Sequence, residues 1–185
     1  PPPTRMPYEP FFRQVLDSGE LGEITLVELK SVSGANLQPG LTWRERIEFS
    51  GQQVLLMGIF AETLNAIVGP YESLSAQTAT PIDTKIDGDK PYRIQIPQVV
   101  TISGRLTGGA LAVEHHTGMA CDNSTPGNSL TIWGTKGTLR YGFDEEVWLA
   151  AAGGRFRSID VPEGLRRGWQ VERGYVGAVR AAKAG

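Results

Sequence analysis

The sequence predicts an α+β fold in which helices pack on one face of a predominantly antiparallel, open β-sheet. Strand-like segments in the second half follow one another around short glycine turns, and successive hairpins pair antiparallel. Helix-like segments stand at the beginning, in the middle and at the end of the 185-residue chain. The regular strand–helix alternation of a parallel sheet is missing.

The first elements are a helix and a strand. Apolar residues recur at helical spacing in residues 8–16, and Gly19 is placed to end that helix in a left-handed conformation. Residues 24–32 are rich in apolar and β-branched side chains, which predicts a strand. A loop rich in glycine, asparagine and proline follows at residues 34–40.

A second helix is expected to begin at Ser50 and Gly51, with Ser50 as its N-cap, and to run to Val68. Gly69 and Pro70 then stop it. Almost every position from 54 to 68 is apolar, so this helix is expected to be buried on more than one side.

The remaining segments are expected to complete the sheet. A strand is expected at residues 73–80, a long polar loop exposed to solvent at 81–97, and a closing amphipathic helix at 171–182. Three hairpins lie between them, and they pair residues 99–106 with 110–120, 130–133 with 138–141, and 145–150 with 156–161.

Length and composition limit the classes of function. Residues 1–185 have the size of one domain, and the start at Pro1 indicates a fragment cut near a domain boundary. Eighteen Lys and Arg against twenty Asp and Glu give a net charge of −2, which excludes a strongly basic nucleic-acid-binding protein. No apolar run approaches the roughly 18 residues of a membrane-spanning helix. The single cysteine, Cys121, excludes a disulfide framework and fits the cytoplasm.

No cofactor or metal site is expected within this segment. The chain lacks the G-x-G-x-x-G turn of a dinucleotide-binding fold, and the glycine turn at residues 134–137 has no helix behind it to hold phosphate. His115 and His116 are adjacent in a predicted strand, so they point to opposite faces and do not readily ligate one metal ion. Either both are structural or surface residues, or one of them lines a cleft. Glu114 shares the face of His116.

Trp43, Arg44 and Arg46 form a candidate ligand-binding group. An indole beside two guanidinium groups, close to a helix N-terminus, suits an anionic or polyhydroxy ligand. The alternative is an indole that covers the sheet edge, with both guanidinium groups solvated. The sequence leaves both interpretations open.

Several of these segments, taken in order, resemble the C-terminal domain of the Gfo/Idh/MocA oxidoreductases. The segment 16–24 (LDSGELGEI) resembles the link into that domain's first strand, and Gly58 matches its glycine-rich central helix. The segments 130–139 (LTIWGTKGTL) and 175–180 (YVGAVR) are similar to its late hairpin and the helix after it.

The resemblance implies a parent protein with two domains. An N-terminal Rossmann domain, absent from this chain, would bind NAD or NADP and supply a catalytic lysine. The present chain would bind a sugar-like or polyol substrate and form a homo-oligomer through the outer face of its sheet. The residues expected to bind substrate are Trp43, Arg46, Phe60, Glu62, Thr63 and His116.

The chain departs from the family pattern at its functional positions. When the motif is anchored on Gly58, the family's Asp, His and Asp correspond to Leu56, Phe60 and Thr63. Leu56 and Phe60 have no titratable group, so they cannot relay a proton and the catalytic residues stay unassigned. The parent is either an oxidoreductase that uses other residues or a non-catalytic homologue that binds a ligand or assembles. An unrelated β-rich, lectin-like module is a third interpretation, which the central and terminal helices disfavour.

Overall fold

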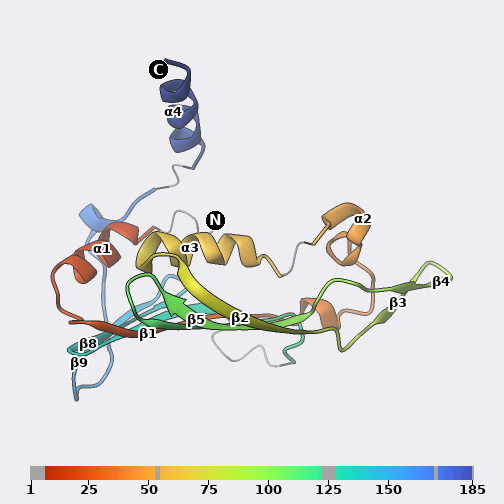
Figure 1. Cartoon of the computed structure of the whole chain (residues 1–185), viewed down its shortest axis with the longest axis horizontal. Coiled ribbons are helices and arrows are strands. Elements are labelled where there is room, and N and C mark those ends of the chain that lie inside the picture. Colours follow the sequence, from red (N-terminus) through yellow and green to blue (C-terminus); the bar gives the residue numbers. More distant parts are fainter. Residues whose placement is uncertain (1–6, 53–54, 122–127, 169–170, 185) are drawn as a thin grey trace.

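The architecture is an open mixed sheet of eight strands with two helices across one face (Figure 1). The computed structural model describes residues 7–52, 55–121, 128–168 and 171–184. The strand order is β10-β9-β8-β7-β1-β6-β5-β2, and β1–β6 is the one parallel pairing in these described ranges. The predicted α+β class with a predominantly antiparallel sheet is therefore confirmed. The strands are β1 (Ile24–Val32), β2 (Tyr71–Ala79), β5 (Val99–Leu106), β6 (Leu111–Thr117), β7 (Asn128–Gly134), β8 (Gly137–Gly142), β9 (Val147–Ala151) and β10 (Arg157–Ser158).

The predicted hairpins are present, with one difference in length. Strands β5 and β6 pair antiparallel, as do β7 with β8 and β8 with β9. Side chains alternate along β5 as expected, because Val100 and Ile102 are buried while Thr101 and Ser103 are exposed. The last predicted strand, residues 156–161, is only the two-residue β10, which pairs with β9 at the sheet edge.

Helices α1 (Glu9–Asp17) and α3 (Met57–Val68) lie on the same face of the sheet (Figure 1). The aromatic side chains of α1 pack against Tyr141 of β8, and the ring centroids of Phe12 and Tyr141 are 5.2 Å apart. Gly19 ends α1 at a φ of 71°, in the left-handed conformation expected for it. The core lies between these helices and the inner sheet face, and its most buried members include Phe12, Leu21, Leu29, Leu64, Leu106, Ile132 and Leu139.

The central helix begins later than the sequence predicts. Ser50 is the last residue of the short helix α2 (Ile47–Ser50), and its hydroxyl donates to the carbonyl oxygens of Arg44 and Arg46. The backbone then adopts positive φ at Gly51, Leu55 and Leu56, so the helix cannot start before Met57. Leu55 and Leu56 belong to the apolar run at residues 54–68 but lie before the helix, where they line a cavity.

The expected burial of this helix on more than one side is also wrong. Phe60, Thr63 and Leu64 are buried against the sheet, while Glu62 and Asn65 on the opposite side are exposed. Apart from the sheet, α1 contacts this helix, where the Arg13 guanidinium donates to the carbonyl oxygen of Ala66 at 2.9 Å. Helix α3 therefore has more apolar side chains than the described structure buries.

The predicted loop at residues 81–97 is instead a β-hairpin. Strands β3 (Thr84–Asp87) and β4 (Lys90–Arg93) form a separate two-stranded sheet around a two-residue turn, where Gly88 has a φ of 59°. Lys85 and the following Ile94 and Ile96 are buried, so the segment is not a solvated loop. The strand sequences TKID and KPYR lack the alternation of apolar and polar residues that would have predicted them.

This hairpin packs on the segment that follows β1, and we call residues 34–51 together with 82–97 the arm. The first part contains the 3₁₀ helices η2 (Ala35–Leu37) and η3 (Trp43–Glu45) and helix α2. The arm stands at the end of the sheet away from α1 (Figure 1). At its base, the amide of Gln98 pairs with both backbone groups of Ile82 at 2.9 and 3.0 Å.

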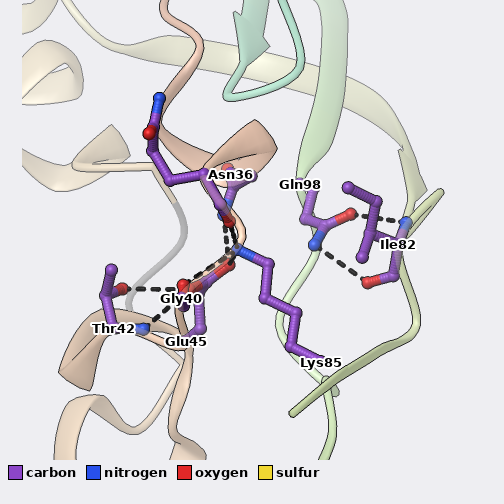
Figure 2. A network of polar contacts seen from close by, with 8 residues as sticks. Asn36, Gly40, Thr42, Glu45, Ile82, Lys85 and Gln98 are labelled. Atoms are coloured by element: carbon purple, nitrogen blue, oxygen red, sulfur yellow. Dashed lines mark hydrogen bonds and ion pairs between the residues drawn. The ribbon is translucent and has the colours of Figure 1, made fainter.

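A buried ion pair joins the two parts of the arm (Figure 2). The Lys85 ammonium lies 2.7 Å from Oε1 of Glu45, and each side chain is only 4% exposed. Lys85 also donates to the carbonyl oxygen of Gln38 at 2.7 Å. Glu45 accepts from the backbone N–H and hydroxyl of Thr42 at 2.9 and 3.1 Å, and from the Asn36 amide at 3.2 Å. Burial alone raises the pKa of Glu45, but the bonds from Lys85, Thr42 and Asn36 outweigh it and hold that pKa below its ordinary value.

The chain ends in 3₁₀ helix η4 (Glu163–Leu165) and helix α4 (Val171–Ala184), which extends away from the sheet (Figure 1). The predicted closing helix is thus confirmed. No helix in the described ranges is long and apolar enough to cross a membrane.

Replacing Lys85 by methionine should loosen the arm without unfolding the sheet. The substitution leaves the Glu45 carboxylate buried without its cation, which costs about 3 kcal/mol or more. We expect roughly 100-fold faster hydrogen exchange at β3 and β4 amides, measured by mass spectrometry or NMR. Lys90→Met, at an exposed lysine of the same hairpin, is the control and should leave exchange unchanged. Equal exchange rates in Lys85→Met and the native chain would show that the ion pair does not hold the arm.

Candidate functional site

A cavity of about 280 Å³ lies between the arm, the end of β1 and the start of α3. It has a polar wall and an apolar wall. The polar wall is formed by Ser31, Ser33, Asn36, Thr42, Arg44, Glu45, Thr117 and Asn128, and the apolar wall by Ala35, Leu55, Leu56, Phe60, Ile96 and Pro97.

The polar wall follows from strand periodicity and from the arm. Ser31 and Ser33 continue the alternate positions of buried Val27 and Leu29, so they face the helix side where the core gives way to the cavity. Asn36 approaches the backbone so closely that a Cβ at Gly118 would collide with its amide oxygen. Because glycine has no Cβ, position 118 leaves room for the Asn36 side chain in this wall.

The apolar wall includes two strained residues. Leu55 and Leu56 adopt left-handed φ values of 49° and 61°, a conformation that costs a leucine roughly 1–2 kcal/mol. Both side chains line the cavity. Phe60, one turn further on, tilts against Phe143 and His116 at centroid distances of 5.5 and 5.9 Å.

Two charged side chains belong to the lining. Glu45 is engaged by Lys85, as described above. Arg44 is exposed, and the carbon of its guanidinium lies 4.3 Å from the centroid of the Trp43 ring, in stacking range.

The structure separates the residues that the sequence predicts to bind substrate. Phe60 lines the cavity, and Thr63 is buried on the same helix, where its hydroxyl donates to the carbonyl of Ile59 at 3.1 Å.

Trp43 is 51% exposed and stacks under Arg44. Arg46 turns to Asp87 and Glu48, and Glu62 lies on the exposed side of α3. Neither Trp43, Arg46, Glu62 nor Thr63 is part of the lining.

His116 lies beneath Phe60 in a buried polar cluster. Its Nε2 is 2.7 Å from Oε2 of Glu114, and the hydroxyl of Tyr71 donates to Oε1 at 2.9 Å. Burial, followed by the charge and hydrogen bond of Glu114, raises the pKa of Tyr71. His116 Nδ1 has no hydrogen-bond partner among the described residues. The side chain of His116 is fully buried, so it supports Phe60 from below and is not part of the lining.

The expected opposite orientation of the two histidines is confirmed. His115 points to the outer sheet face, where its Nε2 is 3.5 Å from Oε1 of Glu28. In the described ranges, no group of three or more His, Cys, Asp or Glu residues is arranged to hold a metal ion.

The described residues do not offer a dinucleotide site. The glycine turn at residues 134–137 joins β7 to β8 directly, so no helix N-terminus faces it. The start of α3 is preceded by Leu55 and Leu56 rather than by a glycine-rich loop. Neither segment therefore provides the glycine-rich loop and helix N-terminus that would hold the pyrophosphate of NAD or NADP.

Sequence reasoning missed most of the polar wall. Asn36 lies in the three-residue helix η2, Thr42 in a loop and Asn128 at the start of β7, and at none of these places does periodicity single the residue out. One signal was available for Thr42, since Thr42 and Glu45 form a capping box around η3. The pairing of Glu45 with Lys85 depends on a hairpin 40 positions away and has no local signature.

Solved structures share this fold. Levoglucosan dehydrogenase in complex with NADH and L-sorbose matches with a TM-score of 0.73 at 18% identity, over 85% of this chain and 45% of that one. An inositol dehydrogenase homologue complexed with NAD+ from Azotobacter vinelandii gives 0.70 at 15%, over 88% and 43%. A super-repressor mutant of Gal80p from Saccharomyces cerevisiae gives 0.69 at 13%, over 87% and 47%. At these identities the likeness establishes the fold alone.

The chain spans less than half the length of each of these structures. No curated protein sequence matches it significantly. The family model described as the GFO/IDH/MocA C-terminal domain matches residues 11–140, which include β1, the arm, α3 and the strands up to β8. The chain therefore belongs to the GFO/IDH/MocA C-terminal domain family, as the resemblance implied.

Proposed function

We propose that this chain is the substrate-binding part of an NAD- or NADP-dependent oxidoreductase that acts on a sugar-like or polyol substrate. The observation that carries the proposal is the cavity at Phe60, the position where the family motif has its histidine. A sugar presents hydroxyl groups around its edge and C–H groups on its ring faces. The polar and apolar walls of the cavity match these two surfaces.

In this proposal the chain binds and orients the substrate, and the chemistry depends on another part of the protein. Hydride transfer is the chemistry that a nicotinamide cofactor supplies when bound. Among the described lining residues, Glu45 is the only carboxylate, and its lowered pKa makes it a weak proton acceptor. Leu56 and Phe60 cannot accept a proton at all. The catalytic base is therefore expected from a Rossmann domain.

Titration of the chain with sugars and with cofactors tests whether it binds substrate but not the cofactor. We expect weak millimolar binding of D-glucose, myo-inositol or L-sorbose, observed by NMR, and no binding of NAD or NADP. Ser33→Trp should fill the cavity and weaken sugar binding at least about tenfold, because steric exclusion removes the site. Ser75→Trp, on exposed strand β2, is the matched control. Tight cofactor binding by this chain, or sugar binding unaffected by Ser33→Trp, would contradict the proposal.

A second function is favoured by the side chains at the family's motif positions. Leu56, Phe60 and Thr63 replace three groups with acid–base or hydrogen-bonding roles, which fits a homologue that binds a ligand without converting it. One similar structure is a repressor, Gal80p, rather than a dehydrogenase.

Turnover distinguishes the two functions. The longer protein that joins this chain to a Rossmann domain should reduce NAD or NADP in a broad screen of sugars and polyols, followed by absorbance at 340 nm. We expect a signal because the cavity is intact. Cofactor binding without turnover of any substrate would support the non-catalytic homologue instead.

We also propose that copies of the chain associate through the outer sheet face. Glu28 and His115 form a pair there, and Lys30 is a neighbour of both on β1. Leu111, on the same face of β6, is 48% exposed. A face with both signs of charge and an exposed apolar residue suits a two-fold contact, in which each patch meets its own copy.

The oligomeric state tests this interface. Light scattering should give at least a dimer at micromolar concentration. Glu28→Lys should shift the equilibrium toward the monomer. The substitution removes the acidic partner of His115 and places a second lysine near Lys30, so like charges would face one another across the two-fold axis. Glu163→Lys, at an exposed position on η4, is the charge-matched control. A stable monomer of the unaltered chain at high micromolar concentration would exclude the interface.

The cytoplasm is the compartment we propose. Cys121 is free and exposed, and a reducing compartment keeps such a thiol from intermolecular oxidation.

A further inference from the structure

We propose that the ligand of the cavity is a monosaccharide-sized polyhydroxy acid, and that Arg44 binds its carboxylate. This inference rests on the proposed function, because it takes the same cavity as the substrate site. It narrows the substrate class from sugars in general to sugar acids.

The charges around the cavity leave a net positive site. The carboxylate of Glu45 is compensated by the Lys85 ammonium at 2.7 Å, and both side chains are almost fully buried. Arg44 has no carboxylate oxygen within 4.0 Å in the described part of the chain. One cationic side chain of the lining is therefore available to a ligand.

The structure also distinguishes the two arginines that the sequence singles out. Arg46 makes ion pairs with Asp87 and with Glu48, the latter at 3.5 Å, and it is not part of the lining. The guanidinium carbon of Arg44 lies over the Trp43 ring, and no described residue accepts a hydrogen bond from its N–H groups. These donors are therefore available to a planar carboxylate, which a guanidinium can bind with two parallel hydrogen bonds.

The size and polarity of the cavity limit the rest of the ligand. A volume of about 280 Å³ lies just below the range for drug-sized ligands, so a nucleotide sugar is too large. The hydroxyls of Ser31, Ser33 and Thr42 suit ring hydroxyls, and Leu55 and Phe60 suit a ring face. A single uncompensated cation matches a carboxylate better than a phosphate ester, which carries about −1.5 to −2 charges at pH 7.

The test compares D-glucuronate with D-glucose, which differ only in having a carboxylate or a hydroxymethyl group at C6. The chain should bind glucuronate more tightly than glucose in calorimetric or NMR titrations. Arg44→Gln should weaken glucuronate binding roughly 10- to 100-fold and change glucose binding less than about twofold. Arg44→Lys should lose part of this affinity, because it keeps the charge without the fork of donors.

Arg155→Gln, at an exposed arginine in the β9–β10 turn, is the matched control and should change neither affinity. An equal loss in Arg155→Gln would show non-specific electrostatic attraction and overturn the proposal. Glucose 6-phosphate binding more tightly than glucuronate would overturn the choice of a carboxylate. If glucose binds as tightly as glucuronate and Ser33→Trp still abolishes that binding, the proposal of a sugar acid is overturned while the proposed sugar-binding function stands. Absence of binding by every sugar would overturn the proposed function as well.

Discussion

The buried pair of Lys85 and Glu45 is the interaction on which the candidate site depends. Isolated buried ion pairs contribute little net stability, because desolvation of both ions offsets their attraction. Here the pair gains further bonds from Thr42, Asn36 and two backbone carbonyls, so each charge is satisfied several times. Its effect is to fix the arm in one position. Without it, the two parts of the arm would be joined mainly by the more exposed ion pair of Arg46 with Asp87 and by the hydrogen bonds of the Tyr92 hydroxyl. The polar wall of the cavity would then lose its buried anchor.

The opposite wall is positioned by strain rather than by charge. The left-handed backbone at Leu55 and Leu56 delays the start of α3, and both residues line the cavity. Such conformations persist only where the surroundings over-determine them, and they concentrate at ligand-binding segments. Phe60 completes this wall from the first turns of the helix, supported by His116 and Phe143. A helix beginning at Ser50, as the sequence predicts, would have left this wall unformed.

The sequence was sufficient where local periodicity and turn chemistry agree. Strand β1, the β5–β6 and β7–β8 hairpins and the ends of α1 were predictable, because alternation and glycine turns specify them directly. The hairpin of β3 and β4 was not, since its buried Lys85 reads as a solvent-facing charge until its partner 40 residues earlier is known. Of the lining residues, the sequence singles out Phe60 and Arg44 as candidates for ligand binding. The others come from strand ends, 3₁₀ helices and loops whose relative positions are set by tertiary contacts. The difference between Arg44 and Arg46 likewise depends on tertiary contacts, because Arg46 is paired with Asp87 and Glu48.

These features together explain a cavity suited to binding and unsuited to proton transfer. Burial raises the pKa of Glu45, but the bonds from Lys85, Thr42 and Asn36 outweigh it and hold that pKa below its ordinary value. Leu56 and Phe60 carry no titratable group. No described lining residue belongs to a type whose ordinary pKa lies between about 5 and 9, whereas a histidine at the Phe60 position would change its charge in that range. If the cavity binds a ligand of fixed charge, as proposed, its affinity should therefore be flat across that range, and a titration by NMR at several pH values measures this.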